Sequence, residues 1–374
     1  MSAVTVIGCG YVADFYMRAL RCYPGVAVAG AYDSDPERAA AFCRYWDVPR
    51  RDSLEAALAA HPRDGIVLNL TNPAAHLSVN RASLGAGCHT YSEKPLALSL
   101  EEARELDDLA AAQGVHLASA PCSFLGESAQ IMARSLREGR IGAPRLIYAE
   151  LDDGFLTQAP LESWRSESGA PWPYRNEFEV GCTLEHAGYH LSWFIACFGS
   201  VTRVVSAGAC LLPEKKGVAG QTPDYASATV YFEAGPVMRL TCSILAPRDH
   251  SIRIIGDDGV LEVGDVWNPS SAVRLRKRML VHGNLIELPF GRRLRPTGAS
   301  HPKLKAKNGS VMNYALGPVE MLEAIAERRD PRMSRAMAVH LNEVVLAVNA
   351  PAGQGALVDI QSRCAPVAPM PWGM

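Results

Sequence analysis

The first 120 residues alternate between short apolar runs and stretches with helical spacing, and this alternation constrains the fold more than any other feature. Short apolar runs of this kind are typical of strands buried on both faces of a parallel sheet. The expected strands are 3–7, 26–32, 65–70, 88–92 and 115–119, with helices near 11–22, 36–45, 53–60, 73–84 and 99–112. Strict alternation of strand and helix predicts an α/β fold with a doubly wound parallel sheet.

The pattern changes near residue 143, where strand-like runs begin to follow one another without long helices between them. Such a succession predicts a large, mostly antiparallel open sheet in an α+β second domain. We expect domains at 1–122 and 123–374, with closing helices at about 313–328 and 334–349 that pack back toward the first domain. The expected strands are 145–151, 202–210, 226–232, 237–244, 251–255, 260–263, 273–276 and 285–288, with one helix over 178–198 and a surface loop over 291–308.

Composition excludes several classes of function. The 374 residues suffice for two cores, and a net charge of -2 gives no basic surface for nucleic acid. No apolar run approaches the roughly 18 residues of a membrane span, and because the first strand begins at residue 3 we expect no signal peptide. None of the ten cysteines forms a Cys-x-x-Cys pair, and most lie in apolar patterns, as buried free thiols do. We therefore expect a reduced, cytoplasmic protein.

A glycine-rich turn, Gly8-Cys9-Gly10-Tyr11-Val12-Ala13, joins the first strand to the first helix. Its glycines permit a tight turn and close approach of the backbone to a pyrophosphate at the helix N-terminus. A turn without a ligand is the alternative. The motif gains weight because Asp33 ends the second strand, where a carboxylate would accept the ribose hydroxyls of NAD and repel the 2′-phosphate of NADP. Ser34 and Arg38 would soften that repulsion, so we expect NAD and leave NADP open.

Polar residues also follow the third and fourth strands. Thr71-Asn72-Pro73 and His76 could contact the ribose or the nicotinamide; alternatively, Asn72 forms a turn before proline and His76 is an ordinary residue of the first helical turn. Glu93-Lys94-Pro95 ends the fourth strand. An ammonium there points into the crevice where open α/β sheets bind ligands, and the proline makes a cis peptide bond plausible.

The helix expected over 178–198 carries His186 and His190, which are four residues apart and share one face. Zinc sites use this spacing, but no third ligand accompanies the pair, so we expect no metal. Two interpretations stay open. The histidines are satisfied core residues, or they transfer protons, since a neutral imidazole suits general-base work near pH 7.

In order, and over nearly the whole chain, these motifs resemble the glucose-fructose oxidoreductase and inositol dehydrogenase (Gfo/Idh/MocA) family of NAD(P)-dependent enzymes. The matching segments are 8–13, 71–76, 86–95, 139–142 and 188–190. Lys94 and His190 match the family pattern. The family typically has an aspartate where this chain has His186, and glycines where it has Val180-Gly181-Cys182. A lysine and a second imidazole nearby would lower the pKa of the histidine and favour a neutral base.

The resemblance implies an N-terminal Rossmann domain and an oxidoreductase that acts on a sugar, cyclitol or sugar derivative. His190, with His186, would take the hydroxyl proton, and Lys94 would stabilise the developing alkoxide. Taken together, the candidate cofactor residues are Gly8, Gly10, Tyr11, Val12, Asp33, Ser34, Arg38, Thr71, Asn72, His76, Glu93 and Lys94. The long non-periodic segment 152–177 would supply substrate contacts from Arg165, Trp172, Tyr174, Arg175 and Glu177, with His186 and His190 from the helix. Alternatively, the polar residues of this segment are solvated and Trp172 anchors the loop.

Two alternatives to the oxidoreductase remain, and the first is a lyase or glycosidase. The family that the chain resembles includes members that oxidise a sugar transiently, eliminate a group and reduce the product back. The departure from the family pattern at His186 keeps this alternative open. The third hypothesis is a catalytically silent sugar or nucleotide sensor, although a sensor would need neither Lys94 nor His190. The family usually oligomerises through the second domain's sheet, so we expect a homodimer or homotetramer, with no nucleic-acid or membrane partner.

Overall fold

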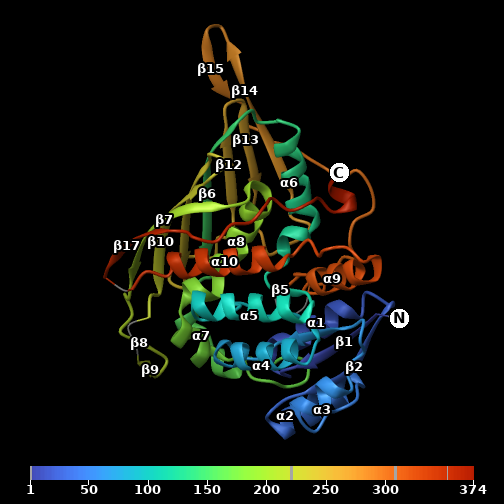
Figure 1. The fold of residues 1–374 in the computed structure, drawn as a ribbon. Coiled ribbons are helices and arrows are strands. Elements are labelled where there is room, and N and C mark those ends of the chain that lie inside the picture. The colour runs from blue at the N-terminus through green and yellow to red at the C-terminus, as the bar shows by residue number, and fades with distance from the viewer. Residues whose placement is uncertain (1, 220–221, 307–309, 352) are drawn as a thin grey trace. The chain divides into compact units, whose positions relative to one another are not determined.

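A computed structural model describes residues 2–219, 222–306, 310–351 and 353–374. The chain forms two compact units (Figure 1). Unit 1 comprises Met1–Cys122, Gln158–Val180 and Asn313–Leu346, and unit 2 comprises Ser123–Thr157, Gly181–Met312 and Ala347–Met374. The division therefore differs from the two continuous domains expected from sequence, because 158–180 and 313–346 lie in unit 1.

Unit 1 is built on a five-stranded parallel sheet, as the alternating pattern predicts. Its strands are β1 (Ser2–Ile7), β2 (Val26–Tyr32), β3 (Ile66–Asn69), β4 (His89–Ser92) and β5 (Leu117–Ser119). The strand order is β2-β1-β3-β4-β5, so the chain changes direction across the sheet between β1 and β3. In open α/β sheets, ligands bind beyond the carboxyl ends of the strands at this switch point.

Local signals place the helices of unit 1. The Asp35 carboxylate accepts from the backbone N–H of Glu37 and Arg38 at the start of α2, and Ser53 and Ser99 cap α3 and α5 in the same way. The helices are α1 (Tyr11–Leu20), α2 (Pro36–Trp46), α3 (Leu54–Ala59), α4 (Pro73–Gly85), α5 (Leu100–Gln113), α7 (Tyr174–Val180), α9 (Leu316–Glu327) and most of α10 (Arg335–Val348).

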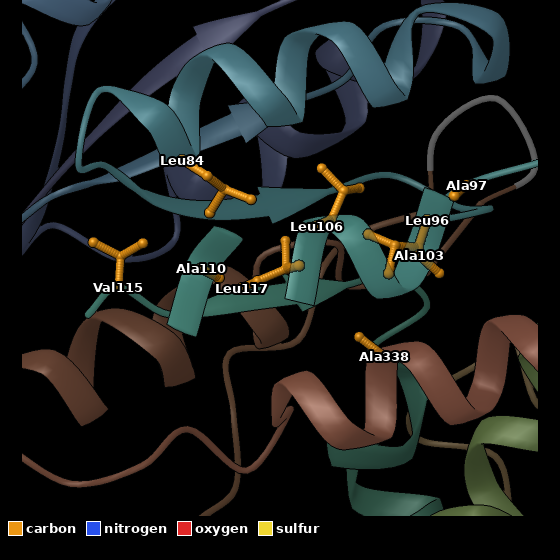
Figure 2. Packing of buried hydrophobic residues seen from close by; sticks show 9 residues of the cluster. All are labelled: Leu84, Leu96, Ala97, Ala103, Leu106, Ala110, Val115, Leu117 and Ala338. Carbon is orange, nitrogen blue, oxygen red and sulfur yellow. The ribbon is translucent and has the colours of Figure 1, made fainter. Parts of the chain in front are cut away.

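One apolar cluster shows why the C-terminal helix belongs to unit 1. Leu106 and Ala110 of α5 pack with Leu84 of α4 and Leu117 of β5, and Ala338 of α10 joins the same cluster (Figure 2). The amide oxygen of Asn342 also accepts from the backbone N–H of Ala97. Burial of apolar side chains is the main stabilising contribution here, at about 1.5–3 kcal/mol for each large residue.

Unit 2 is built on a large open sheet. Its strand order is β15-β14-β13-β12-β6-β11-β10-β7-β17, with β16 beside β14. The described pairs are antiparallel except β6–β11, which is parallel. Its strands are β6 (Pro144–Asp152), β7 (Val201–Ala209), β10 (Tyr225–Phe232), β11 (Val237–Ser243), β12 (Ile252–Gly256), β13 (Gly259–Val263), β14 (Val273–Val281), β15 (Asn284–Glu287), β16 (Arg292–Arg293) and β17 (Gly355–Asp359), with a separate hairpin of β8 (Glu214–Lys215) and β9 (Val218–Ala219). Its helices are α6 (Glu127–Arg137) and α8 (Cys182–Phe198), and the latter packs on β6, β10 and β11.

Several expectations for this half are wrong or incomplete. The single helix expected over 178–198 is two helices, α7 and α8, because Gly181 between them has φ +96°. Helix α6 and strand β17 were not predicted, and β14 extends beyond the expected 273–276. The surface loop expected over 291–308 contains β16, and its last two residues, 307 and 308, lie outside the described residues.

All ten cysteines are free thiols, and Cys22, Cys197, Cys210 and Cys364 are only partly buried. Across the described ranges, every helix is too short or too polar to cross a membrane.

Candidate functional site

The turn between β1 and α1 has the conformation expected of a dinucleotide-binding motif. Gly8 has φ +96°, and a Cβ there would lie 2.7 Å from the carbonyl carbon of Leu70, so the turn itself requires this glycine. Gly10 is the N-cap of α1 and has an ordinary extended backbone, and a Cβ there would meet no protein atom within 4 Å. The space at Gly10 therefore fits a ligand that approaches the helix N-terminus, as a pyrophosphate does.

The turns after three neighbouring strands lie at one edge of the sheet. The backbone N–H of Leu70 donates to the carbonyl of Ile7 at 2.7 Å, and that of Glu93 donates to the carbonyl of Asn69 at 2.8 Å. The glycine turn, Thr71 and the Glu93-Lys94-Pro95 segment are thereby held side by side at the carboxyl ends of β1, β3 and β4.

Asp33 lies at the end of β2 and is engaged by Arg38. The guanidinium donates two hydrogen bonds to the carboxylate, from Nε at 3.0 Å and Nη2 at 2.8 Å. The backbone N–H groups of Cys9 and Asp35 donate to the same carboxylate at 2.7 and 2.8 Å. Burial alone would raise the pKa of Asp33, but these hydrogen bonds lower it. The carboxylate is thus charged and paired with the Arg38 guanidinium. Ser34 beside it is exposed, and the effect of these residues on a 2′-phosphate stays a prediction.

The segment that carries Lys94 is held in place by the side chain of Glu93. The carboxylate of Glu93 accepts from the hydroxyl of Tyr16 at 2.7 Å and from the backbone N–H of Lys94 at 2.9 Å. Burial, together with the charge of Glu93, raises the pKa of Tyr16 well above its usual value, so the hydroxyl stays a donor. The Lys94–Pro95 peptide bond is cis, as the sequence suggests, and Lys94 is half-buried.

His76 connects this segment to the turn after β3. Its ring is fully buried, with Nδ1 2.6 Å from the carbonyl oxygen of Pro95 and Nε2 3.0 Å from that of Thr71. Asn72 is the exposed N-cap of α4, and Thr71 donates from its hydroxyl to Asn69 at 2.6 Å. The observed contacts of His76 support the shape of the site; contact of these residues with a cofactor stays a prediction.

The segment 158–180 is tied to α1 by a carboxylate that the sequence did not single out. Asp14 is 1% exposed and accepts from Nε1 of Trp46 at 2.5 Å, and from the backbone N–H and hydroxyl of Ser168 at 2.9 and 2.8 Å. Arg18 of α1 also lies 3.5 Å from the carboxylate of Glu167. Helix α1 therefore holds the segment 158–180, which is expected to contact substrate.

The proposed substrate residues occupy two clusters of that segment. Trp164 and Trp172 pack with ring centroids 5.2 Å apart, and the guanidinium of Arg165 donates to the carbonyl oxygens of Glu162 and Trp164 at 2.7 and 2.9 Å. In α7, the Arg175 guanidinium lies 5.5 Å from the ring centre of Tyr174. Glu177 of the same helix is half-buried.

In unit 2, the two histidines of α8 have different surroundings. His190 is fully buried, and burial, with the charge of His250 adding to it, lowers the pKa of His190 to about 3. The pKa of His190 is therefore lowered, as expected, but burial is the main cause. The second imidazole that contributes is that of His250, whereas the sequence pointed to His186. His186 is 8% exposed, and its Nε2 lies 3.8 Å from Oδ2 of Asp153.

Asp153 belongs to a cluster of charged and aromatic side chains, the histidine–aspartate cluster, which comprises Asp153, His186, His250, Asp265 and Trp267. Nε2 of His250 lies 3.5 Å from Oδ1 of Asp153, and its Nδ1 lies 3.5 Å from Oδ1 of Asp265. The Trp267 ring packs on both imidazoles, with centroids 4.1 Å from His250 and 5.9 Å from His186.

Four of these five residues were not predicted from the sequence: Asp153, His250, Asp265 and Trp267. The available signal was weak: polar residues stand at strand ends, where Asp153 follows β6, His250 precedes β12 and Asp265 follows β13. Within the part of the chain that the structure describes, no three histidine, cysteine or acidic side chains are arranged to hold a metal ion.

Comparison with known proteins gives matches over both halves of the chain. Residues 3–120 match the model of an oxidoreductase family with an NAD-binding Rossmann fold, and residues 129–262 match a GFO/IDH/MocA C-terminal domain. D-apiose dehydrogenase of Paraburkholderia graminis is 28% identical over 246 residues, which are 64% of this chain and 59% of that protein. Trans-1,2-dihydrobenzene-1,2-diol dehydrogenase of Danio rerio is 23% identical over 348 residues, which are 91% of this chain and 93% of that protein.

Among solved structures, levoglucosan dehydrogenase in complex with NADH and levoglucosan is similar with a TM-score of 0.76. The identity is 18%, and the match covers 96% of this chain and 100% of that chain. At that identity the likeness shows the shared fold alone.

Proposed function

We propose a function from one premise: the chain belongs to the GFO/IDH/MocA oxidoreductase family. It is an NAD(P)-dependent oxidoreductase whose substrate is a sugar, cyclitol or sugar derivative, and the hydride is transferred at a hydroxyl or keto carbon of that substrate. The names of two relatives, which are dehydrogenases of D-apiose and of a cyclic diol, support this substrate class.

The observation that carries the proposal is the arrangement at the carboxyl edge of the unit 1 sheet. The open space at Gly10, the paired carboxylate of Asp33 and the half-buried Lys94 all belong to turns at this edge. A dinucleotide needs the first two features, whereas oxidation of an alcohol needs a cation close to the developing oxyanion.

Each residue then has a role. When bound, the nicotinamide accepts or supplies the hydride. Lys94 stabilises the alkoxide that develops as the hydroxyl carbon is oxidised, while Glu93 and Tyr16 hold the backbone beside it. The hydroxyl proton goes to an imidazole of α8, His186 or His190.

The remaining contacts belong to the cofactor and to the segment 158–180. The backbone from Gly8 to Val12 and the side chains of Asp33, Arg38 and Thr71 hold the dinucleotide, with NAD preferred and NADP accepted. Substrate hydroxyls are bound by Arg165, Trp172, Tyr174, Arg175 and Glu177. Hydroxyl-rich ligands suit charged donors and acceptors beside flat indole and phenol rings.

Lys94 provides the direct test. We would screen sugars, cyclitols and sugar derivatives with NAD+ and NADP+, and compare the parent with Lys94→Ala and Lys94→Arg. We expect Lys94→Ala to retain NADH binding and to lose about 10²–10³ in kcat, as loss of an oxyanion donor does, and Lys94→Arg to retain part of the activity.

Turnover of Lys94→Ala at the parent rate would contradict the assignment. The same screen separates the alternatives. Turnover of a glycoside without net NADH formation would indicate a lyase or glycosidase, and cofactor binding without chemistry would indicate a sensor.

We also propose that the protein is cytoplasmic and forms a homodimer or homotetramer through the unit 2 sheet. The register places Leu146, Val205, Tyr231 and Leu357 on one face of the sheet, and each is at least 39% exposed. Exposed apolar side chains that share a face favour association. Light scattering should give a multiple of the 40.3 kDa chain mass, and a monomer at micromolar concentration would contradict this.

A further inference from the structure

Strand ends of the unit 2 sheet place a carboxylate beside His186. Asp153 directly follows β6, and its backbone N–H donates to the carbonyl of Ser243 at the end of β11 at 3.0 Å. This pairing fixes the backbone, and Oδ2 of Asp153 lies 3.8 Å from Nε2 of His186. The side chain that replaces an aspartate of the family pattern therefore has an aspartate beside it, supplied by a different element.

The second oxygen of Asp153 faces a second imidazole. Oδ1 lies 3.5 Å from Nε2 of His250, whose side chain is 1% exposed and whose Nδ1 lies 3.5 Å from Asp265. Trp267 packs on the rings of both His186 and His250 and shields the group. The two oxygens of Asp153 are thus divided between two histidines.

The charges of the cluster favour an ionised Asp153. Burial alone would raise the pKa of Asp153, but the contact with His250 and the charge of His186 lower it. Burial alone would lower the pKa of His250, but Asp153 and Asp265 raise it, so His250 is readily an imidazolium. Arg248 also faces the cluster, 3.5 Å from Asp265.

We propose that His186 is the residue that exchanges a proton with the substrate hydroxyl, and that Asp153, held by His250, is its positioning residue. The proposal rests on the oxidoreductase function proposed above. The Asp153 carboxylate, 3.8 Å from Nε2 of His186, favours by its charge the tautomer with the proton on Nε2 and so leaves the lone pair of Nδ1 for the hydroxyl, as the aspartate of a catalytic triad does for its histidine.

In the oxidation step, the hydroxyl O–H bond breaks and an N–H bond forms at Nδ1 of His186. The carbon loses its hydride to the oxidised cofactor, so one alcohol gives one carbonyl group. The new imidazolium is stabilised by Asp153, which stays a carboxylate. His190 is poorly suited to this step because its pKa of about 3 makes it a weak base. The distances of 3.5 and 3.8 Å exceed a normal hydrogen bond, and such contacts commonly shorten when substrate binds.

Asp153→Asn is the informative change, because it keeps the shape and removes the charge. The amide has one acceptor oxygen, which the His250 imidazolium retains, so the NH2 group turns toward Nε2 of His186. In the full-length protein with 15N-labelled histidine, we expect the Nε2–H tautomer of His186 in the parent and the Nδ1–H tautomer in Asp153→Asn. The signal is assigned with a His186→Gln variant, and this readout needs no substrate.

Kinetics supply the second readout. With the best substrate from the screen above, we expect Asp153→Asn to lower kcat by at least about 10²-fold while KM changes less than about threefold, since the loss lies in the proton-transfer step. Asp152→Asn is the matched control: Asp152 is the preceding residue, bonds to the Ser243 hydroxyl at 2.6 Å, and its replacement should leave tautomer and kcat unchanged.

Retention of the Nε2–H tautomer in Asp153→Asn, or a kcat within threefold of the parent, would overturn the proposal. The proposed function fails in a different way, by lack of NADH binding or of turnover in the parent. A variant that binds NADH normally but keeps the parent tautomer and rate rejects the positioning role alone.

Discussion

Replacing Gly10 by alanine should separate ligand binding from folding. The backbone at Gly10 has φ -78° and ψ -168°, which any L-residue adopts, and a Cβ there meets no protein atom within 4 Å. The methyl group therefore fills only the space assigned to the pyrophosphate. The folded protein should tolerate the change, whereas the dinucleotide should not.

The magnitudes follow from two opposing effects on folding and one effect on binding. At a position whose backbone suits it, alanine in place of glycine stabilises the folded protein by about 0.4–1 kcal/mol, because it lowers the conformational entropy of the unfolded chain. At a helix N-cap, however, alanine is less favourable than glycine by a similar amount. The stability of the free Gly10→Ala protein should thus change by less than about 0.5 kcal/mol. Obstruction of the backbone approach should raise the Kd for NADH at least about tenfold, which is about 1.4 kcal/mol.

The assay is thermal unfolding with and without NADH, together with a fluorescence titration. At a ligand concentration of about 100 times the parent Kd, the parent gains about 2.7 kcal/mol, and a tenfold weaker variant gains about half of that. Gly25→Ala is the control, because its Cβ also meets nothing within 4 Å and it lies outside the glycine turn. If Gly10→Ala bound NADH within twofold of the parent Kd, the assignment of this space to the cofactor would be refuted.

Three further predictions test other parts of the structure. Arg38→Leu removes the cation that offsets Asp33, so the ratio of NADPH to NADH affinity, measured by fluorescence titration, should fall about tenfold; an unchanged ratio would contradict the role of Arg38. Gly181→Ala would place a Cβ 2.3 Å from the methyl carbon of Thr222, on a backbone with φ +96° that alanine rarely adopts. Urea unfolding should show that the free energy of unfolding falls by about 1–3 kcal/mol. An unchanged free energy of unfolding would contradict the backbone conformation described between α7 and α8. Asp14→Ala leaves buried donors without their acceptor, which should cost about 1–3 kcal/mol in the same assay and speed proteolysis within 158–180; unchanged cleavage would show that other contacts hold this segment.

The sequence by itself determined the five-stranded parallel sheet of unit 1, the helices between its strands and the class of cofactor. Buried parallel strands are short and apolar, and their helices start at caps such as Asp35 and Ser99, so both signals are local. The glycine turn and the Glu93-Lys94-Pro95 segment are also local, because each depends on backbone conformation at consecutive residues. Helix α6 went unpredicted although its apolar residues stand at 129, 131, 132, 133 and 136, and all but 131 follow helical spacing, so the sequence does hold a signal for it.

Only the tertiary structure decided the features that depend on distant neighbours. The break at Gly181 reflects the close approach of Thr222, and β17 is a strand because it pairs with the edge of β7. The place of Asp153 and His250 follows from the pairing of β6 and β12, which brings together residues 97 positions apart. Spacing along a chain records local geometry, whereas a cluster assembled from strand ends is set by register between strands, and no local pattern encodes that register.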